Sequence, residues 1–212
     1  MKTSLLLLLT FGCIGCNDNS VGVIAPTELF PLKHGFAIFN YKVQNFDSLG
    51  QTYDTSSTIE SVGPDTLLNG RRLYQYFGLV SLNLIDSQFF LLTGSDGIYQ
   101  YVTPQDTAYL LYKFPAQVND VYTSFRDTIT VEALNQSITT DAGSFNCIVY
   151  KQRTNLYYGS SPKYWWLTTY VAYGIGKVRY ELTIADPSIK VWTKMRLMRV
   201  DLVKYTNYPL AG

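Results

Sequence analysis

The sequence predicts an all-β fold, a single antiparallel domain of about ten to twelve strands. The first observation is that apolar residues alternate with a period of two between turns rich in Gly, Asn, Asp and Pro. The second is the composition, in which 18 tyrosines and only 16% charged residues favour strands. The third is that no stretch carries a long helical stripe of apolar residues, so little helix is expected outside the signal peptide.

The individual strands follow in order from this alternation. They are expected at 36–43, 52–61, 74–84, 89–93, 99–102, 108–114, 128–133, 145–149, 164–173, 177–184 and 189–205. Turns are expected at Gly63–Asp65, Asn69–Gly70 and Gly94–Gly97. In the strand 177–184, Val178, Tyr180 and Leu182 form the apolar face, and Lys177 belongs to the opposite face. Strands about 8–15 residues apart leave no room for crossover helices, which makes antiparallel hairpins the expected connection.

The last expected strand indicates how this sheet is shaped. Its apolar residues lie at odd positions up to Met195 and Leu197, and at even positions from Met198 to Val200. One inserted residue, a β-bulge, produces such a change of face, and bulges bend sheets. We therefore expect a bulge near Leu197–Met198 and a strongly curved sheet or partly open barrel.

The first sixteen residues have the order of a secretory signal. Met1–Lys2 supplies a positive start, Leu5–Leu9 a short apolar run, and Gly15–Cys16 the end. This ending resembles a bacterial lipoprotein signal, which implies acylation of Cys16 and attachment to the membrane through that lipid. The expected organisation is a signal peptide over 1–16, a tether over 17–27 and a single β-domain over 28–212. Because Asn17 is not Asp, the sorting rule of such lipoproteins implies the outer membrane of the cell envelope.

Five short stretches resemble a loose group of envelope lipoproteins from Gram-negative bacteria. They are LFPLKHG, DGIYQY, LYKFPAQVNDVY, ITTDAGSFNCIVYK and YVAYGIGKVRYE. The resemblance spans most of 29–181 and implies one all-β domain. The group has no known activity, so it implies no catalytic or binding residue.

Charge and residue types argue against several functions. A net charge of +1 offers no electrostatic attraction to nucleic acid. His34 is the one histidine, which leaves a Ser-His-Asp or Cys-His mechanism without support, and no catalytic residue is assigned. No His/Cys cluster or phosphate-binding loop is present, so neither a metal nor a cofactor is expected. Cys147 alternates with Phe145 and Val149 and is expected to be a buried, unreactive thiol.

Aromatic residues crowd the last third of the chain. We take Trp165, Trp166 and Trp192 as candidate ligand-binding residues, since adjacent Trp165 and Trp166 face opposite sides of a regular strand. Cross-strand packing inside a β-domain explains the same aromatics without a ligand. The leading hypothesis is a non-enzymatic, lipid-anchored envelope protein that binds an apolar or amphipathic ligand. The alternatives are a surface carbohydrate-binding lipoprotein that uses exposed aromatics, and a structural subunit of an envelope complex.

Overall fold

The computed structural model describes residues 29–32, 36–78, 89–158, 161–185 and 195–208, and it confirms the all-β prediction. Twelve strands form one sheet in which every strand pair is antiparallel. They are β1 (Phe36–Phe46), β2 (Thr52–Leu68), β3 (Arg71–Phe77), β4 (Phe89–Gly94), β5 (Gly97–Val102), β6 (Thr107–Lys113), β7 (Val121–Ser124), β8 (Asp127–Thr140), β9 (Gly143–Tyr158), β10 (Ser161–Ala172), β11 (Gly176–Ala185) and β12 (Met195–Tyr208). A 3₁₀ turn, η2 (Thr103–Gln105), adds almost no helix to the described residues.

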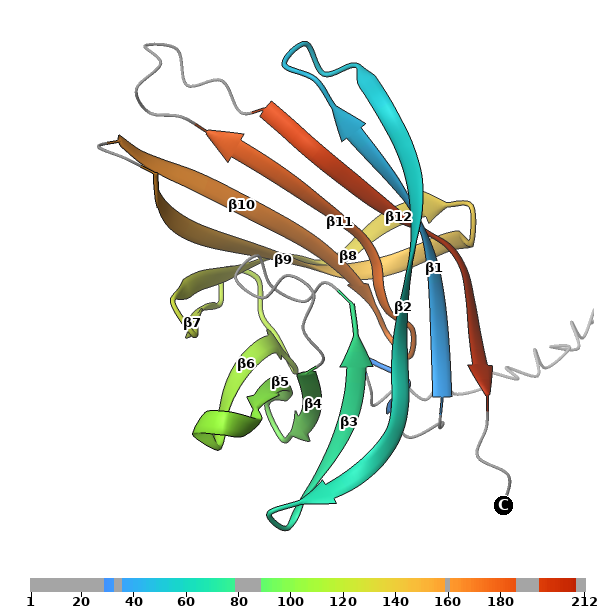
Figure 1. Cartoon of the computed structure of the whole chain (residues 1–212), viewed down its shortest axis with the longest axis vertical. Helices are drawn as coiled ribbons and strands as arrows, with labels where there is room; N and C mark the ends of the chain where they lie inside the picture. The colour runs from blue at the N-terminus through green and yellow to red at the C-terminus, as the bar shows by residue number, and fades with distance from the viewer. Residues whose placement is uncertain (1–28, 33–35, 79–88, 159–160, 186–194, 209–212) are drawn as a thin grey trace, which may run out of the picture.

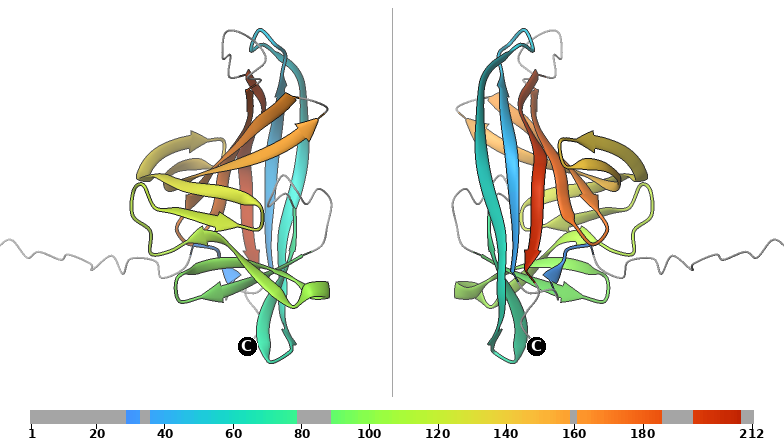
Figure 2. Two further views of the ribbon diagram at one scale, coloured as in Figure 1. Left: turned by 90° about the vertical axis from the view of Figure 1, so that its left-hand side faces the viewer. Right: turned by 90° about the vertical axis from the view of Figure 1, so that its right-hand side faces the viewer.

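The strands curl into a nearly closed, barrel-like sheet. Their order is β6-β5-β4-β3-β2-β1-β12-β11-β10-β9-β8-β7, so the first and last strands of the domain lie side by side in its middle. The two edge strands, β6 and β7, approach each other without pairing. Figures 1 and 2 show the long strands β1, β2 and β9–β12 curving around one side, and the short strands β4–β7 on the other. The expected strongly curved sheet is confirmed.

A β-bulge occurs in β12 at the predicted place. Leu182 of β11 pairs with Met198, whereas the next residue pairs with Arg196, so Leu197 is the extra residue. The shift keeps Val200 and Leu202 in the core, fully buried. It also moves the charged Arg199 and Asp201 to the outer face, where Arg199 Nε donates to Asp201 Oδ2 at 2.6 Å.

Two expectations about turns and faces are wrong. Gly63–Asp65 is not a turn: β2 continues through it, and the register merely shifts between Val62 and Asp65. A bulge absorbs a proline that a regular ladder would exclude. The register between β10 and β11 shifts after Tyr170 of β10, so Val178 has no pairing partner on β10. Because of this shift, Lys177 faces the core, although its position in the alternation predicted the opposite face. Asn69–Gly70 does form a hairpin turn, with φ angles of 50° and 73°.

The inside of the barrel holds one hydrophobic core. Side chains from nearly every strand meet there, including Phe39 and Tyr41 of β1, Tyr76 of β3 and Tyr180 of β11. The segment 29–32 before β1 is also buried, and the Phe30 ring stacks on Tyr112 of β6 with centroids 5.6 Å apart. The chain therefore enters the domain by filling one part of its core.

A second, smaller core lies on the outer face. The β8–β9 hairpin folds back over β10–β12, and Arg179 Nη2 donates to Thr139 O across the contact at 3.0 Å. Ile138, Cys147, Ala172 and Val178 are enclosed between the two layers. Cys147 has no exposed surface, which confirms that it is buried. Burial raises the pKa of its thiol to about 12, so the nucleophilic thiolate is scarce at neutral pH.

Candidate functional site

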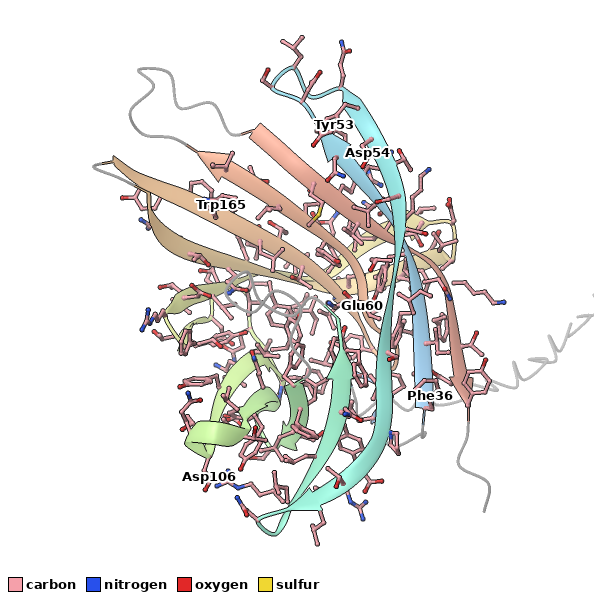
Figure 3. The ribbon with its side chains drawn as sticks, viewed as in Figure 1. Phe36, Tyr53, Asp54, Glu60, Asp106 and Trp165 are labelled. Carbon is pink, nitrogen blue, oxygen red and sulfur yellow. The ribbon has the colours of Figure 1, made fainter. Side chains whose placement is uncertain are left out.

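A buried ion pair occupies the middle of the barrel (Figure 3). Glu60 comes from β2 and Lys177 from β11, and the two side chains are only 1% and 2% exposed. Lys177 Nζ lies 2.7 Å from Glu60 Oε2 and 2.9 Å from Oε1. The pair therefore joins two strands that are separated in the sheet by β1 and β12.

Tyrosines surround this ion pair. The hydroxyls of Tyr76 and Tyr180 donate to Glu60 at 2.5 and 3.4 Å, and the hydroxyl of Tyr41 donates to Lys177 O at 2.9 Å. Lys177 Nζ also lies 4.9 Å from the Tyr180 ring centroid, a favourable cation–π distance. Gly78, directly after β3, packs against the Glu60 side chain, and a Cβ there would approach Glu60 Cγ to 2.6 Å.

Burial controls the protonation of the cluster. Desolvation, and next the charge of Glu60, raise the pKa of Tyr41 and of Tyr76 well above the ordinary value. Desolvation lowers the pKa of Lys177, while Glu60 acts in the opposite direction. These groups satisfy one another and are shielded from solvent, so the cluster fixes the shape of the barrel and offers no room for a substrate.

A half-buried apolar row lies farther along the inner face of the long strands. Cross-strand pairing places Trp165 of β10 beside Ile184 of β11. Met198 of β12 and Val43 of β1 continue the same face, and all four side chains are partly exposed. Tyr180, which donates to Glu60, pairs with Thr169 of β10. Trp165 lies four residues from Thr169 along β10, which is about 13 Å. Figure 3 shows Trp165 on the long strands, well away from Glu60.

The polar atom of this row is the indole nitrogen of Trp165. This nitrogen, Nε1, is buried, and no acceptor lies within hydrogen-bond distance among the described residues. An indole N–H only donates, and nearly all buried donors in folded proteins have an acceptor. The cross-strand partner of Trp165 on β9, Thr154, is also buried, and the Thr154 hydroxyl likewise has no hydrogen-bond partner among the described residues. Farther along the same face are Thr58 of β2 and Asn45 of β1, whose Nδ2 donates to Asp54 Oδ2 at 3.0 Å. The inner face of the long strands therefore combines an apolar surface with polar groups beside it.

Trp166 lies on the outer face, as the alternation requires. It pairs with the exposed Arg153, and its ring lies 6.2 Å from the Tyr164 ring with an angle of 41° between the planes. The Arg153 guanidinium lies 4.4 Å from the Tyr164 centroid. Rings tilted in this way do not form the flat platform on which a sugar stacks. The third candidate, Trp192, and also Cys16 and His34 lie outside the described residues.

Sequence reasoning missed the ion pair. Glu60 and Lys177 are 117 residues apart, and the shift that buries Lys177 depends on how β11 pairs with β10. One sequence signal for this shift is Gly176, directly before Lys177, because a glycine in a strand often marks a bulge. In the structure Gly176 has a φ of 95°.

The described residues show neither a metal-ligand cluster nor a membrane-spanning helix. Within the ranges that the structure describes, no three His, Cys, Asp or Glu side chains come together as metal ligands. Over the same ranges, no helix has the length and apolar character needed to cross a bilayer.

Comparisons with known proteins show that the fold of this chain is similar to that of a solved structure. The sequence matches no protein-family model and no curated protein. Among solved structures, a Bacteroides fragilis protein assigned as exported and described as having a YmcC-like fold superimposes with a TM-score of 0.51 at 12% identity. A protein of Parabacteroides distasonis assigned as a lipoprotein gives a TM-score of 0.41 at 15% identity. Each comparison covers 84% of this chain and 98% of the other. At such identities the first likeness shows the fold alone.

Proposed function

We propose that this chain is a lipid-anchored, non-enzymatic protein of the cell envelope that holds an amphipathic ligand against Trp165. Gly15–Cys16 after an apolar run supports the anchor, with Cys16 acylated and the outer membrane as the destination. The buried, unpartnered Nε1 of Trp165 is the observation that carries the ligand. A ligand with an acceptor at this point would complete the hydrogen bonding of the wall.

The chemistry of the inner wall defines the class of ligand. Val43, Ile184 and Met198 offer apolar surface for a hydrocarbon portion, and burying such surface is favourable by about 25 cal/mol per Å². Trp165 Nε1 would donate to an ester, ether or hydroxyl oxygen. Thr58 and Asn45 stand on the same face for a polar head group. A lipid or a lipid-like amphiphile combines these features, whereas a fully polar ligand would leave the apolar row uncovered.

The ionisable groups of the barrel support a binding role over an enzymatic one. Glu60 and Lys177 are the only oppositely charged pair with both side chains buried to 98% or more among the described ion pairs, and they are turned toward each other. A general acid or base must reach a substrate within hydrogen-bond distance, directly or through one water. In the described barrel this pair instead joins opposite walls.

Calorimetric titration tests the ligand. Purified protein is titrated with lysophospholipids below their micelle concentration, using wild type, Trp165→Phe and Trp166→Phe. The first variant removes the donor from the inner wall, and the second is a matched change on the outer face. Loss of one hydrogen bond corresponds to about a fivefold higher Kd. We expect that loss for Trp165→Phe and none for Trp166→Phe; equal effects, or no binding by wild type, would contradict the proposal.

A second candidate, the structural subunit, has one specific observation in its favour. The outer face of β3, β2, β1 and β12 carries neighbouring exposed apolar side chains: Phe77 at 43%, Ile59 at 64%, Phe36 at 37% and Tyr208 at 50% exposure. Such a patch fits a protein partner. Ile59→Glu should then abolish cross-linking to that partner in envelopes while leaving lysophospholipid binding intact.

A further inference from the structure

The seam between β6 and β7 contains a second candidate site, independent of the Trp165 wall. These edge strands are not paired, and side chains replace the missing backbone bonds over part of their length. The Tyr122 hydroxyl donates to Leu111 O at 2.7 Å, and the Tyr150 hydroxyl donates to Lys113 O at 2.7 Å. Next to this closed part lies a cavity of about 110 Å³, whose lining includes Gln100, Tyr109, Ser124, Phe125 and Gln152.

Gln100 is the informative side chain of this cavity. It lies on the inner face of β5, opposite Tyr109 of β6, and is 4% exposed. Its Nε2 is buried, and no acceptor lies within hydrogen-bond distance among the described residues. Of the two other carboxamides that line the cavity, Gln105 is exposed and Gln152 Nε2 donates to the buried Asp127 Oδ2. The seam thus holds one amide anchored by the fold and one whose donor the described fold does not use.

The lining of the cavity defines what it accepts. None of the described side chains that line it is a carboxylate, lysine or arginine; the nearby Arg126 guanidinium lies over the Phe125 ring, 5.3 Å from its centroid. The interior of the cavity therefore suits an uncharged group. Tyr109 and Phe125 meet edge-to-face with centroids 5.2 Å apart, and they give the cavity an aromatic wall. Phe125 is half exposed at the rim and holds a left-handed φ of 56°, which is uncommon for an aromatic residue. The Gln100 amide and the Ser124 hydroxyl can hydrogen-bond to a neutral sugar, and the aromatic wall can contact its apolar face.

We propose that this seam cavity, which we call the Gln100 pocket, binds one exocyclic arm of a neutral sugar residue. A cavity of about 110 Å³ suits a hydroxymethyl or acetamido arm better than a whole sugar ring. The arm's oxygen accepts a hydrogen bond from Gln100 Nε2, and the ring of the sugar lies at the rim beside Phe125.

The test is saturation-transfer NMR on the full-length protein purified in detergent. The probes are the methyl glycosides of glucose and galactose and of N-acetylglucosamine, each in excess. We expect transfer to the exocyclic protons of at least one probe. Gln100→Leu keeps the volume and removes the donor, so it should abolish that transfer or weaken binding about fivefold. Gln136→Leu, an exposed change on β8 away from the pocket, should have no effect.

Thermal unfolding of the same variants separates binding from structure. A buried Nε2 without an acceptor costs stability and contributes no hydrogen bond, so Gln100→Leu should unfold at the same temperature as wild type or higher. A lower Tm would make Gln100 a structural residue and overturn the proposal. Transfer that persists in Gln100→Leu, or no transfer from any probe because the cavity holds only water, would also overturn it. Trp165→Phe should leave the sugar signals unchanged, so this proposal and the lipid proposal fail separately.

Discussion

Removing one member of the buried ion pair should be far more damaging than removing an exposed one. Lys177→Met leaves the Glu60 carboxylate 1% exposed and without its ammonium partner at 2.7 Å. Breaking a buried pair in this way costs about 3–5 kcal/mol. Since folded domains are stable by about 5–15 kcal/mol, the variant should lose a large part of its free energy of unfolding.

A second change in the same variant should restore much of that loss. Glu60→Gln removes the negative charge and keeps an oxygen that can accept from the Tyr76 hydroxyl. In the wild-type structure that hydroxyl lies 2.5 Å from Glu60 Oε2. The double variant Glu60→Gln/Lys177→Met should therefore lie within about 2 kcal/mol of wild type, because no unpaired charge remains buried. Since each single change leaves a buried charge unpaired and costs about 3–5 kcal/mol, the two would then be strongly non-additive, with a coupling energy of at least about 4 kcal/mol.

Urea unfolding followed by circular dichroism measures these free energies. The matched control is Lys151→Met, which breaks a pair of similar length, 2.6 Å, whose members are 29% and 40% exposed. Exposed pairs contribute about 0–1 kcal/mol, so this control should change little. If Lys177→Met were no more destabilising than Lys151→Met, the role given to the buried pair would be refuted.

Three other predictions concern tyrosines, Cys147 and Cys16. Burial raises the pKa of the core tyrosines, which are Tyr41, Tyr76, Tyr112, Tyr122, Tyr150 and Tyr180, so their contribution to stability is complete below about pH 10 and is lost as the pH rises above it. Alkaline titration should therefore show cooperative unfolding together with a jump in tyrosinate absorbance above about pH 10. A gradual rise with no loss of structure would contradict it. Cys147, with a pKa of about 12, should resist a thiol reagent in native protein and react after unfolding. Cys16→Ala should move the protein from the membrane to the soluble fraction or stall its processing, and unchanged membrane association would contradict the lipid anchor.

Local patterns of the sequence predicted the sheet well. The bulge at Leu197 followed from a change of parity within one strand, because a register slip exchanges the two faces wherever it occurs. The expected turn at Gly63–Asp65 failed for a related reason. A proline interrupts a ladder, and the same residues allow either a turn or a bulge, so the outcome depends on β3.

Long-range contacts were beyond such patterns. Lys177 faces the core because β11 shifts against β10, and its partner Glu60 comes from the far side of the sheet. No alternation marks the segment Leu29–Leu32, yet Phe30 packs on Tyr112 from β6. Of the candidate ligand residues, the opposite faces of Trp165 and Trp166 could be predicted, whereas the buried Nε1 of Trp165 depends on the closure of the whole wall.

Native mass spectrometry of the protein extracted from envelopes tests the central claim most directly. The account predicts two additions to the chain that begins at Cys16. One is covalent, with the mass of two or three acyl chains on Cys16. The other is a lipid-sized ligand that dissociates on unfolding and is lost or reduced in Trp165→Phe but kept in Trp166→Phe. An unmodified N-terminus with no bound ligand would contradict both parts of the proposed function.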